Sequence, residues 1–319
     1  MKNASVRSNV SAPPRRRGLV YNLCKYWQLY LFLLIPVAYI LIFHYYPMLG
    51  LQLAFKRFNI RLGMWGSPWI GLKNFAKFFK SYQFGRILPN TLLISFYSLS
   101  VNFFVAIVFA LALNAMRKKR LQKVMQNISY IPHFISTVVM VGMMLQMLNP
   151  RLGLYGNIVT ALTGSEPSDL FAIPGAFRHL YVWSGVWQNT GWNSIIYVAA
   201  LSSVPPELHE AAQIDGASRL KRIFHVDLPA ILPTATILLI MNAGNILSVG
   251  FEKVYLMQNS VNLSTSEVIS TYVSKVAMTA GTGDFGYSTA IGMFNSVVNL
   301  VLLVIVNTIA SKVSSTSLW

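Results

Sequence analysis

The stretch TLLISFYSLSVNFFVAIVFALALNAM, residues 91–116, contains no Asp, Glu, Lys or Arg. An α-helix needs roughly 20 mainly apolar residues to cross the hydrocarbon core of a bilayer. This stretch exceeds that length, and its polar side chains are uncharged hydroxyls and amides. It therefore predicts a membrane-spanning helix over residues 91–113.

Five more windows without charged side chains lie before and after this stretch. Together the six cover residues 26–55, 87–116, 124–150, 179–206, 228–251 and 285–311. Within them we place spans near 27–46, 91–113, 127–148, 181–201, 230–250 and 287–309. The sequence thus predicts an all-α integral membrane protein with six transmembrane helices in a domain over residues 27–310.

The composition agrees with a membrane location. Only 11% of the 319 residues are charged and 54% are hydrophobic, with a mean hydropathy of +0.51. Soluble domains carry about 25% charged residues, so a water-soluble enzyme is disfavoured. The net charge is +17. Because the basic residues lie between apolar runs, we expect membrane lipid, not nucleic acid, to balance them.

Neither a metal centre nor a catalytic site is predicted. The one cysteine, Cys24, excludes an intrachain disulfide, and the five histidines are scattered without the spacing of a zinc site. The chain also contains no G-x-x-x-x-G-K-[ST] motif and no Gly-Lys pair. We therefore expect no catalytic residues, no metal and no cofactor bound by this chain.

The basic residues also predict an orientation. With the N-terminus inside, more than half of the 26 Lys and Arg fall on the cytoplasmic side. The cluster Arg117–Arg120, directly after a span, is the strongest single indication. We expect residues 1–26 to form a basic cytoplasmic N-terminal segment and residues 311–319 a cytoplasmic tail.

One predicted outer loop is itself basic. Phe75, Phe78, Phe79 and Tyr82 repeat at i, i+3, i+4 and i+7, which predicts an amphipathic helix lying in the membrane interface with its lysines toward headgroups. The alternative is that these lysines attract an anionic solute.

The predicted cytoplasmic loop over residues 202–229 begins with PPELHEAAQIDG, residues 205–216. Two prolines at the start, acidic residues in the first turn and Gly216 as a stop predict a short helix, with Ser203 as its cap. The pair Ala211-Ala212 keeps one face thin, so another protein can approach the backbone closely. A loop that only faces lipid does not need such a complete set of helix start and stop signals.

The same loop resembles the EAA loop of ATP-binding-cassette importer permeases. The matching pattern is Glu210-Ala211-Ala212, three residues, Gly216, nine residues, Val226, one residue and Leu228-Pro229. The usual pattern has Ile at the position of Val226. GLKNF at 71–75 and Asn90-Thr91 at the start of the second span resemble the sugar-importer branch of these permeases. VGFEKVYL at 249–256 and SEVISTY at 266–272 resemble the poly- and oligosaccharide permeases of that branch.

This resemblance implies the architecture of a type I importer permease in the bacterial inner membrane. The loop would contain a coupling helix that docks on a cytoplasmic ATPase. The residues assigned to coupling are Glu210, Ala211, Ala212, Asp215, Gly216, Leu228 and Pro229. The implied partners are a second similar permease, two ATPase subunits that hold ATP and Mg, and an extracytoplasmic solute-binding protein. The sequence alone is equally compatible with a homodimer.

Polar side chains repeat along the predicted spans and suggest a solute path. The candidates are Asn189, Asn193 and Tyr197 in the fourth span, Asn242 and Asn245 in the fifth, and Asn295 and Asn299 in the sixth. Amides and aromatic rings are the groups that bind sugars. They also hold transmembrane helices together, so packing remains the alternative for each. The similar stripe of Thr91, Ser95, Ser98 and Asn102 we assign to packing.

We therefore predict a permease that carries a saccharide, with an acidic oligosaccharide favoured by the basic outer loop. The alternatives are an importer permease for a non-sugar solute and a gradient-driven secondary transporter. Secondary transporters commonly place charged residues within the membrane, whereas the six windows have none.

Overall fold

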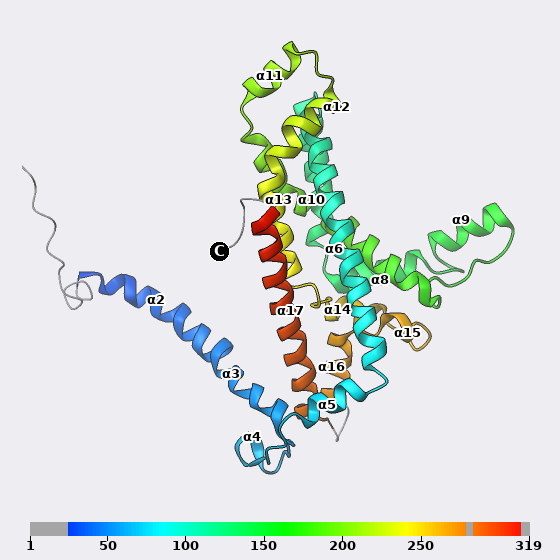
Figure 1. The fold of residues 1–319 in the computed structure, drawn as a ribbon. Coiled ribbons are helices and arrows are strands. Elements are labelled where there is room, and N and C mark those ends of the chain that lie inside the picture. Colours follow the sequence, from blue (N-terminus) through cyan, green and yellow to red (C-terminus); the bar gives the residue numbers. More distant parts are fainter. Residues whose placement is uncertain (1–24, 279–282, 314–319) are drawn as a thin grey trace, which may run out of the picture. The chain divides into compact units, whose positions relative to one another are not determined.

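The computed structural model describes residues 25–278 and 283–313, and these form helices joined by turns (Figure 1). The chain divides into two compact units, one ending at Gln52 and the other beginning at Leu53. The prediction of an all-helical chain is confirmed.

The first unit is a helical rod whose apolar side chains are open. It comprises α2 (Trp27–Ile40), the π-helical turn η1 (Leu41–Tyr45), α3 (Tyr46–Met48) and the start of η2 (Leu49–Phe55). None of the residues of α2 is buried. An apolar helix without protein cover needs lipid or another chain around it, which agrees with the predicted first span over 27–46.

The second unit is built on four long helices: α6 (Phe84–Asn114), α10 (Pro174–Ser202), α13 (Leu228–Ala243) and α17 (Phe285–Val313). Helices α6 and α10 pack along one another, and α13 packs on α10 and α17. Ala106 and Ala110 of α6 pack in one buried cluster with Tyr197 of α10 and Ile231 of α13. Small residues at such contacts let the backbones approach closely, as in other membrane helix bundles.

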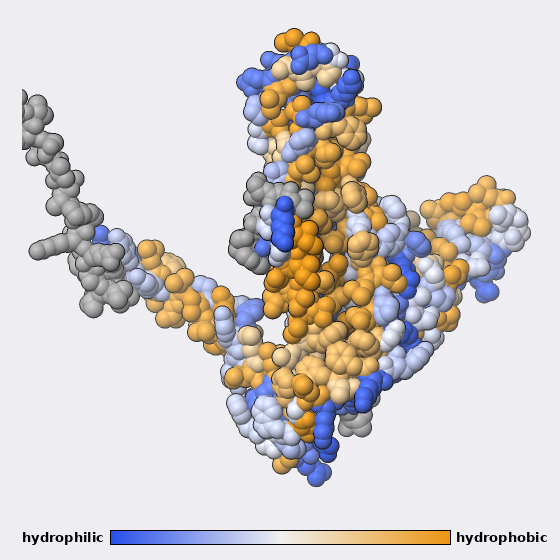
Figure 2. Space-filling view, viewed as in Figure 1, coloured by the Kyte–Doolittle hydropathy of each residue, from blue (hydrophilic) through white to orange (hydrophobic). Residues whose placement is uncertain are grey.

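Shorter helices surround this bundle. Their bounds are α4 (Gly63–Gly66), α5 (Lys73–Lys80), α7 (Lys119–Tyr130), η3 (Ile131–Phe134), α8 (Thr137–Met147), α9 (Leu154–Thr163), α11 (Pro206–Ile214), α12 (Arg219–Arg222), η4 (Ile223–Asp227), α14 (Phe251–Met257), α15 (Leu263–Ser266) and α16 (Ile269–Met278). Figure 2 shows hydrophobic residues over the middle of the bundle, with hydrophilic residues concentrated at the α11–α12 end and near α5.

Hydropathy finds fewer spans in the structure than the six predicted. Among the described residues, four helical runs are long and apolar enough to cross a membrane: Trp27–Phe55, Phe84–Asn114, Arg219–Ala243 and Phe285–Lys312. A bent pair of helices makes a fifth if it counts as one span. Helix α10 has 29 residues, about 44 Å of helix, but Trp, Asn, Gln and Gly dilute its apolar character. The six-helix count is therefore not confirmed.

The third predicted span, 127–148, is not one straight helix. The chain bends by 98° between Lys119–Phe134 and Thr137–Met147. Pro132 lacks the N–H that an α-helix needs, and the Ser136 hydroxyl accepts a hydrogen bond from the Val139 amide (3.3 Å) to start α8. A proline followed by an N-cap starts a new helix in a new direction. The fifth predicted span, 230–250, is also too long, because α13 ends at Ala243.

The amphipathic helix predicted around residues 73–82 exists as α5 and packs as protein core on one side. Phe78 is fully buried and lies in a cluster with Ile87, Ile269 and Ile291. Phe79 stays half exposed, and Tyr82 lies beyond the helix end. The aromatic face predicted for lipid is therefore shared between the core of the second unit and the surface.

Candidate functional site

The predicted coupling helix is present as α11, and its end is fixed by Gly216. Gly216 has a φ of +75°. The Ala217 amide donates to the Ala212 carbonyl (2.8 Å), and the Gly216 amide donates to the Gln213 carbonyl (3.0 Å). These two bonds form a Schellman motif, which needs a left-handed residue at the position of Gly216. Ser203 is not the N-cap; its hydroxyl donates to the Ala200 carbonyl at the end of α10.

The surface of α11 is open along its length. None of its residues is buried, and Glu210, Ala211, Asp215 and Gly216 are exposed while Ala212 is half-buried. In Figure 1, α11 stands beyond the end of the helix bundle. Of the residues assigned to coupling, those in α11 and the turn after it thus lie on a surface that the described chain leaves largely uncovered.

One polar contact ties α11 to the bundle. His209 Nε2 lies 3.3 Å from Asp227 Oδ1, and Asn114 Nδ2 at the end of α6 donates to the same carboxylate oxygen at 3.2 Å. Asp227 is buried at the end of η4. Directly after it, Leu228 packs against the α6–α10 cluster. Sequence reasoning missed this contact, although a carboxylate directly before a span was a visible signal.

A cavity of about 700 Å³ lies among α6, α10, α13 and residues 245–253. Five of the seven predicted path residues line it: Asn189, Asn193, Tyr197, Asn242 and Asn245. Tyr197 is buried, whereas Asn193, Asn242 and Asn245 are exposed toward the space. The structure therefore brings the candidates from two spans into one wall.

The two candidates of the sixth span lie elsewhere. Asn299 Oδ1 accepts a hydrogen bond from the Leu247 amide (3.0 Å), and its Nδ2 donates to the Ser248 hydroxyl (3.2 Å). These bonds fasten the turn after α13 to α17, which is a packing role. Asn295 is half-buried outside the cavity lining. A helical repeat shows that residues share one face of a helix, but it does not show whether that face contacts a cavity or another part of the protein.

The assignment of the second-span stripe to packing is wrong for three of its four residues. Ser95, Ser98 and Asn102 line the cavity from α6. Thr91 does pack: its hydroxyl donates to the Ile87 carbonyl (2.7 Å) and accepts from the Ile269 amide (3.0 Å). The cavity thus has hydroxyls and amides on facing helices, a lining suited to polyols.

Lys253 of α14 is a cavity residue that the sequence analysis did not single out. Its ammonium donates to the Tyr181 carbonyl (2.7 Å) and lies 4.5 Å from the centre of the Tyr181 ring. Burial lowers the pKa of Lys253 to about 8, because a desolvated ammonium is less stable than in water. The sequence does contain a signal for this residue, because a lysine lies two residues beyond the charge-free window 228–251.

The α10 wall of the cavity is braced from behind by the bent segment of the third predicted span. His133 stacks on Trp192 at 4.4 Å between ring centres, and its Nδ1 lies 2.9 Å from Asn189 Oδ1. Gln188 Nε2 donates to the Ile135 carbonyl (2.8 Å). Two adjacent turns of the wall are therefore positioned by residues of η3 and the bend.

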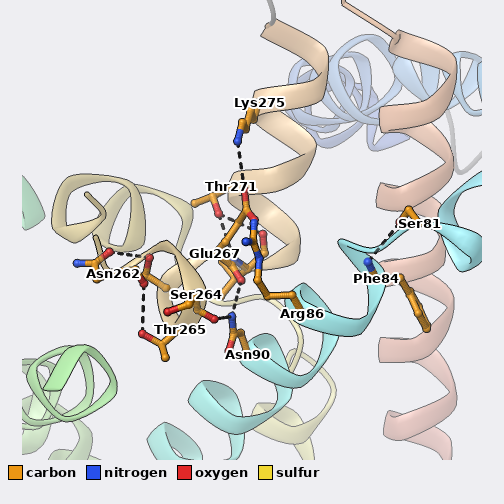
Figure 3. Close-up of polar contacts among 12 residues, drawn as sticks. Ser81, Phe84, Arg86, Asn90, Asn262, Ser264, Thr265, Glu267, Thr271 and Lys275 are labelled. Atoms are coloured by element: carbon orange, nitrogen blue, oxygen red, sulfur yellow. Dashed lines mark hydrogen bonds and ion pairs between the residues drawn. The ribbon is translucent and has the colours of Figure 1, made fainter. Parts of the chain in front are cut away.

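At the α5–α16 end, a buried carboxylate joins three helices (Figure 3). Glu267 is 2% exposed and pairs with Arg86 of α6 and, at 3.5 Å, with Lys275 of α16. Asn90 donates to the Glu267 carbonyl (3.2 Å) and accepts from Arg178 of α10 (2.9 Å). The two cationic partners balance the charge of the Glu267 carboxylate. We therefore assign this cluster a structural role, in which it holds the helices together.

Metal binding has no candidate in the described part of the chain, where no three His, Cys, Asp or Glu side chains gather around one point.

Comparison with known proteins gives one consistent answer. Residues 103–315 match the family described as binding-protein-dependent transport system inner membrane component. The polygalacturonan/rhamnogalacturonan transport system permease protein YteP of Bacillus subtilis (strain 168) is 38% identical over 298 residues, 93% of this chain and 92% of the relative. Protein LplB of the same organism is 39% identical over 291 residues, 91% of each chain.

Solved structures agree in fold and sequence. A chain of a bacterial ABC transporter involved in the import of the acidic polysaccharide alginate matches with a TM-score of 0.85 and 37% identity, over 93% of this chain and 99% of that one. The same transporter type in complex with alginate pentasaccharide-bound periplasmic protein gives 0.86 and 36%, over 94% and 99%.

Proposed function

This chain belongs to the binding-protein-dependent transport system inner membrane components, and from this premise we propose that it carries an acidic oligo- or polysaccharide through the cavity bounded by α6, α10 and α13. It is a permease subunit of an ABC importer, a multi-pass membrane protein that transports and does not itself catalyse a reaction. This membership supports an ATP-driven importer and leaves the gradient-driven transporter without support.

The lining of the cavity carries the proposal. Amides, serine hydroxyls and aromatic rings from α6, α10 and α13 face one space of about 700 Å³, within the usual range of ligand sites at roughly 300–1,000 Å³. Such groups bind sugar hydroxyls and ring faces. The name of YteP and the alginate importer both concern acidic polysaccharides, and that likeness supports an acidic solute here.

Coupling to ATP hydrolysis is assigned to α11. Its thin face at Ala211 and Ala212, with Glu210 beside it and the fixed turn at Gly216, offers a rigid projection for a groove on a partner. When the ATPases close, the movement of α11 would be transmitted to α13 through Leu228 and Pro229. ATP and Mg would be held by the ATPase subunits, and this chain would bind no cofactor.

The proposed assembly contains a second, similar permease, two ATPase subunits and an extracytoplasmic solute-binding protein. A match to a transporter in complex with its periplasmic protein supports that last partner. For α11 to reach an ATPase, the α11–α12 end of the second unit faces the cytoplasm. Both termini are then cytoplasmic, in the bacterial inner membrane.

The experiment is uptake and ATP hydrolysis by the complete importer in proteoliposomes, with binding protein loaded with uronate oligosaccharides. Wild type is compared with a Glu210→Lys, Gly216→Pro double variant. The control is Glu166→Lys, which breaks an exposed ion pair with Arg151 outside the loop. We expect stimulated hydrolysis and uptake in wild type and control, and neither in the double variant.

Two results would contradict the proposal. Uptake by the double variant at the wild-type rate would remove α11 from coupling. Stimulation by a non-sugar solute, with none by any oligosaccharide, would leave the importer in place and change its cargo.

A further inference from the structure

We propose that Lys253 is a specificity-determining residue whose ammonium binds the carboxylate of a uronic acid unit in the cavity. This inference rests on the proposed function, since it concerns the solute that passes between α6, α10 and α13. It adds a single contact that distinguishes an acidic sugar from its neutral counterpart.

The position of the ammonium is fixed by α10. Nζ of Lys253 donates to the Tyr181 carbonyl at 2.7 Å and lies over the Tyr181 ring at 4.5 Å from its centre. An ammonium has three donors, and the carbonyl takes one of them. Two donors remain on the ammonium, and Lys253 lines the cavity. A long flexible side chain is thus held in one place before any solute arrives.

Gly185 leaves the space that this arrangement needs. A Cβ atom at Gly185 would lie 3.2 Å from Lys253 Nζ, closer than nine in ten such contacts, so the ammonium would have to shift by a few tenths of an ångström. Gly185 also lines the cavity, one turn along α10 from Tyr181. The helix face therefore accommodates the ammonium at a point where any other residue would crowd it.

Within the described chain, no carboxylate forms an ion pair with Lys253. Of the described residues that line the cavity, Lys253 alone is charged, and it takes part in none of the ion pairs found in the described chain. By contrast, Lys77 pairs with Asp284 at 2.9 Å. A desolvated, unpaired cation is costly, and a carboxylate brought by the solute would lower that cost.

The chemistry around the ammonium suits a uronate. Ammonium–carboxylate hydrogen bonds are roughly twice as strong as neutral ones, whereas a neutral sugar offers only hydroxyls. Asn245 and Ser248 line the same cavity and complement hydroxyls. Burial lowers the pKa of Lys253 to about 8, so the group remains mainly charged at neutral pH, and a bound carboxylate favours the charged form further.

The test uses the complete importer in proteoliposomes and two matched probes. One is a uronate oligosaccharide, and the other is its carboxyl-reduced form, in which each carboxylate is replaced by a hydroxymethyl group. The two probes are offered together, so that they compete for uptake. Each is supplied at a concentration that saturates the binding protein. The variants are Lys253→Met, Lys253→Arg and the control Lys80→Met, which removes an exposed lysine of α5.

We expect Lys253→Met to reduce uronate uptake about tenfold, the ratio that corresponds to about 1.4 kcal/mol, with uptake of the reduced probe nearly unchanged. Lys253→Arg retains most of the preference, and Lys80→Met retains all of it. Gly185→Ala, which displaces the ammonium and leaves Lys253 in place, shifts the preference in the same direction by a smaller factor.

An equal loss of both probes, or no loss of either, in an inserted Lys253→Met protein with normal basal ATP hydrolysis would overturn this inference alone. If Lys253→Met fails to insert, Gly185→Ala decides the matter by the same criterion. Failure of wild type to import either probe would instead overturn the proposed function.

Discussion

Helices α10 and α11 follow one another in the chain and are held in opposite ways. Helix α10 packs against α6, α7, α13 and α15, and Gly191 lies against the Ser129 backbone. Helix α11 has no buried residue, and His209 connects it to the bundle through a contact with Asp227. A wall that shapes a cavity needs many contacts, whereas a projection that meets another protein needs rigidity and an open face.

The largest effect should come from a substitution in the tightly packed helix, α10. A Cβ at Gly191 would lie 2.2 Å from the Ser129 carbonyl oxygen, so Gly191→Ala forces α10 away from α7. Overpacking typically costs about 1–3 kcal/mol, and a backbone neighbour places this case at the upper end. Thermal unfolding in detergent measures it. Gly292→Ala, at a helical glycine with open space, is the control and should be neutral. Equal melting of both variants would contradict the close packing.

The next effect concerns the tie of α11. His209→Ala removes a partner of the buried Asp227 carboxylate, whose remaining hydrogen bond comes from Asn114. We expect coupled ATP hydrolysis to fall about fivefold, equivalent to about 1 kcal/mol of coupling, with the melting temperature nearly unchanged. His225→Ala, at an exposed histidine bonded to the Lys221 carbonyl, is the matched control. A matching loss in both variants would assign the effect to the loop in general.

The same contrast explains what the sequence predicts well. The end of α11 at Gly216 depends on neighbours within five residues, so local signals suffice. The cavity depends on which helix faces meet. Periodicity therefore found Asn189, Asn193 and Asn242, but it also selected Asn299, which fastens a turn, and it set aside Ser98 and Asn102, which line the cavity.

Two other differences have local causes that compete with hydropathy. The third span bends because Pro132 interrupts the backbone hydrogen bonds and Ser136 starts a new helix, features hidden within an apolar window. The pattern of charges along the chain does not indicate a role for Lys253, because its burial depends on Tyr181 and Gly185 of α10. Membrane helices are thus predictable one at a time, and their shared surfaces are not.

A smaller effect is the pH dependence of solute preference. With a pKa of about 8, Lys253 is about nine-tenths charged at pH 7 and about one-tenth at pH 9. The lowered pKa means that charge is present below pH 8 and lost above it. Preference for uronate over its reduced form should fall several-fold across this range. The bound carboxylate raises the pKa and makes that fall smaller than the loss of charge alone.

Other groups near Lys253 contribute little to this change. The tyrosines of the lining, Tyr181 and Tyr197, belong to a residue type that ordinarily titrates near pH 10. Lys253→Met should show a flat profile, which separates the effect from any titration of the binding protein. A profile in Lys253→Met as steep as in wild type would assign the pH dependence to another subunit.

The smallest effect distinguishes Ser203 and Ser218, which lie before and after α11. The Ser218 hydroxyl accepts from the Lys221 amide at 3.4 Å and caps α12, whereas the Ser203 hydroxyl donates to a carbonyl of α10. Caps contribute about 0.5–2 kcal/mol, and this long bond falls at the low end. Ser218→Ala should therefore speed amide hydrogen exchange about twofold over residues 219–222, and Ser203→Ala should leave exchange in α11 unchanged. Faster exchange of α11 in Ser203→Ala would mean that this serine supports α11 and that this helix has a second contact with the bundle.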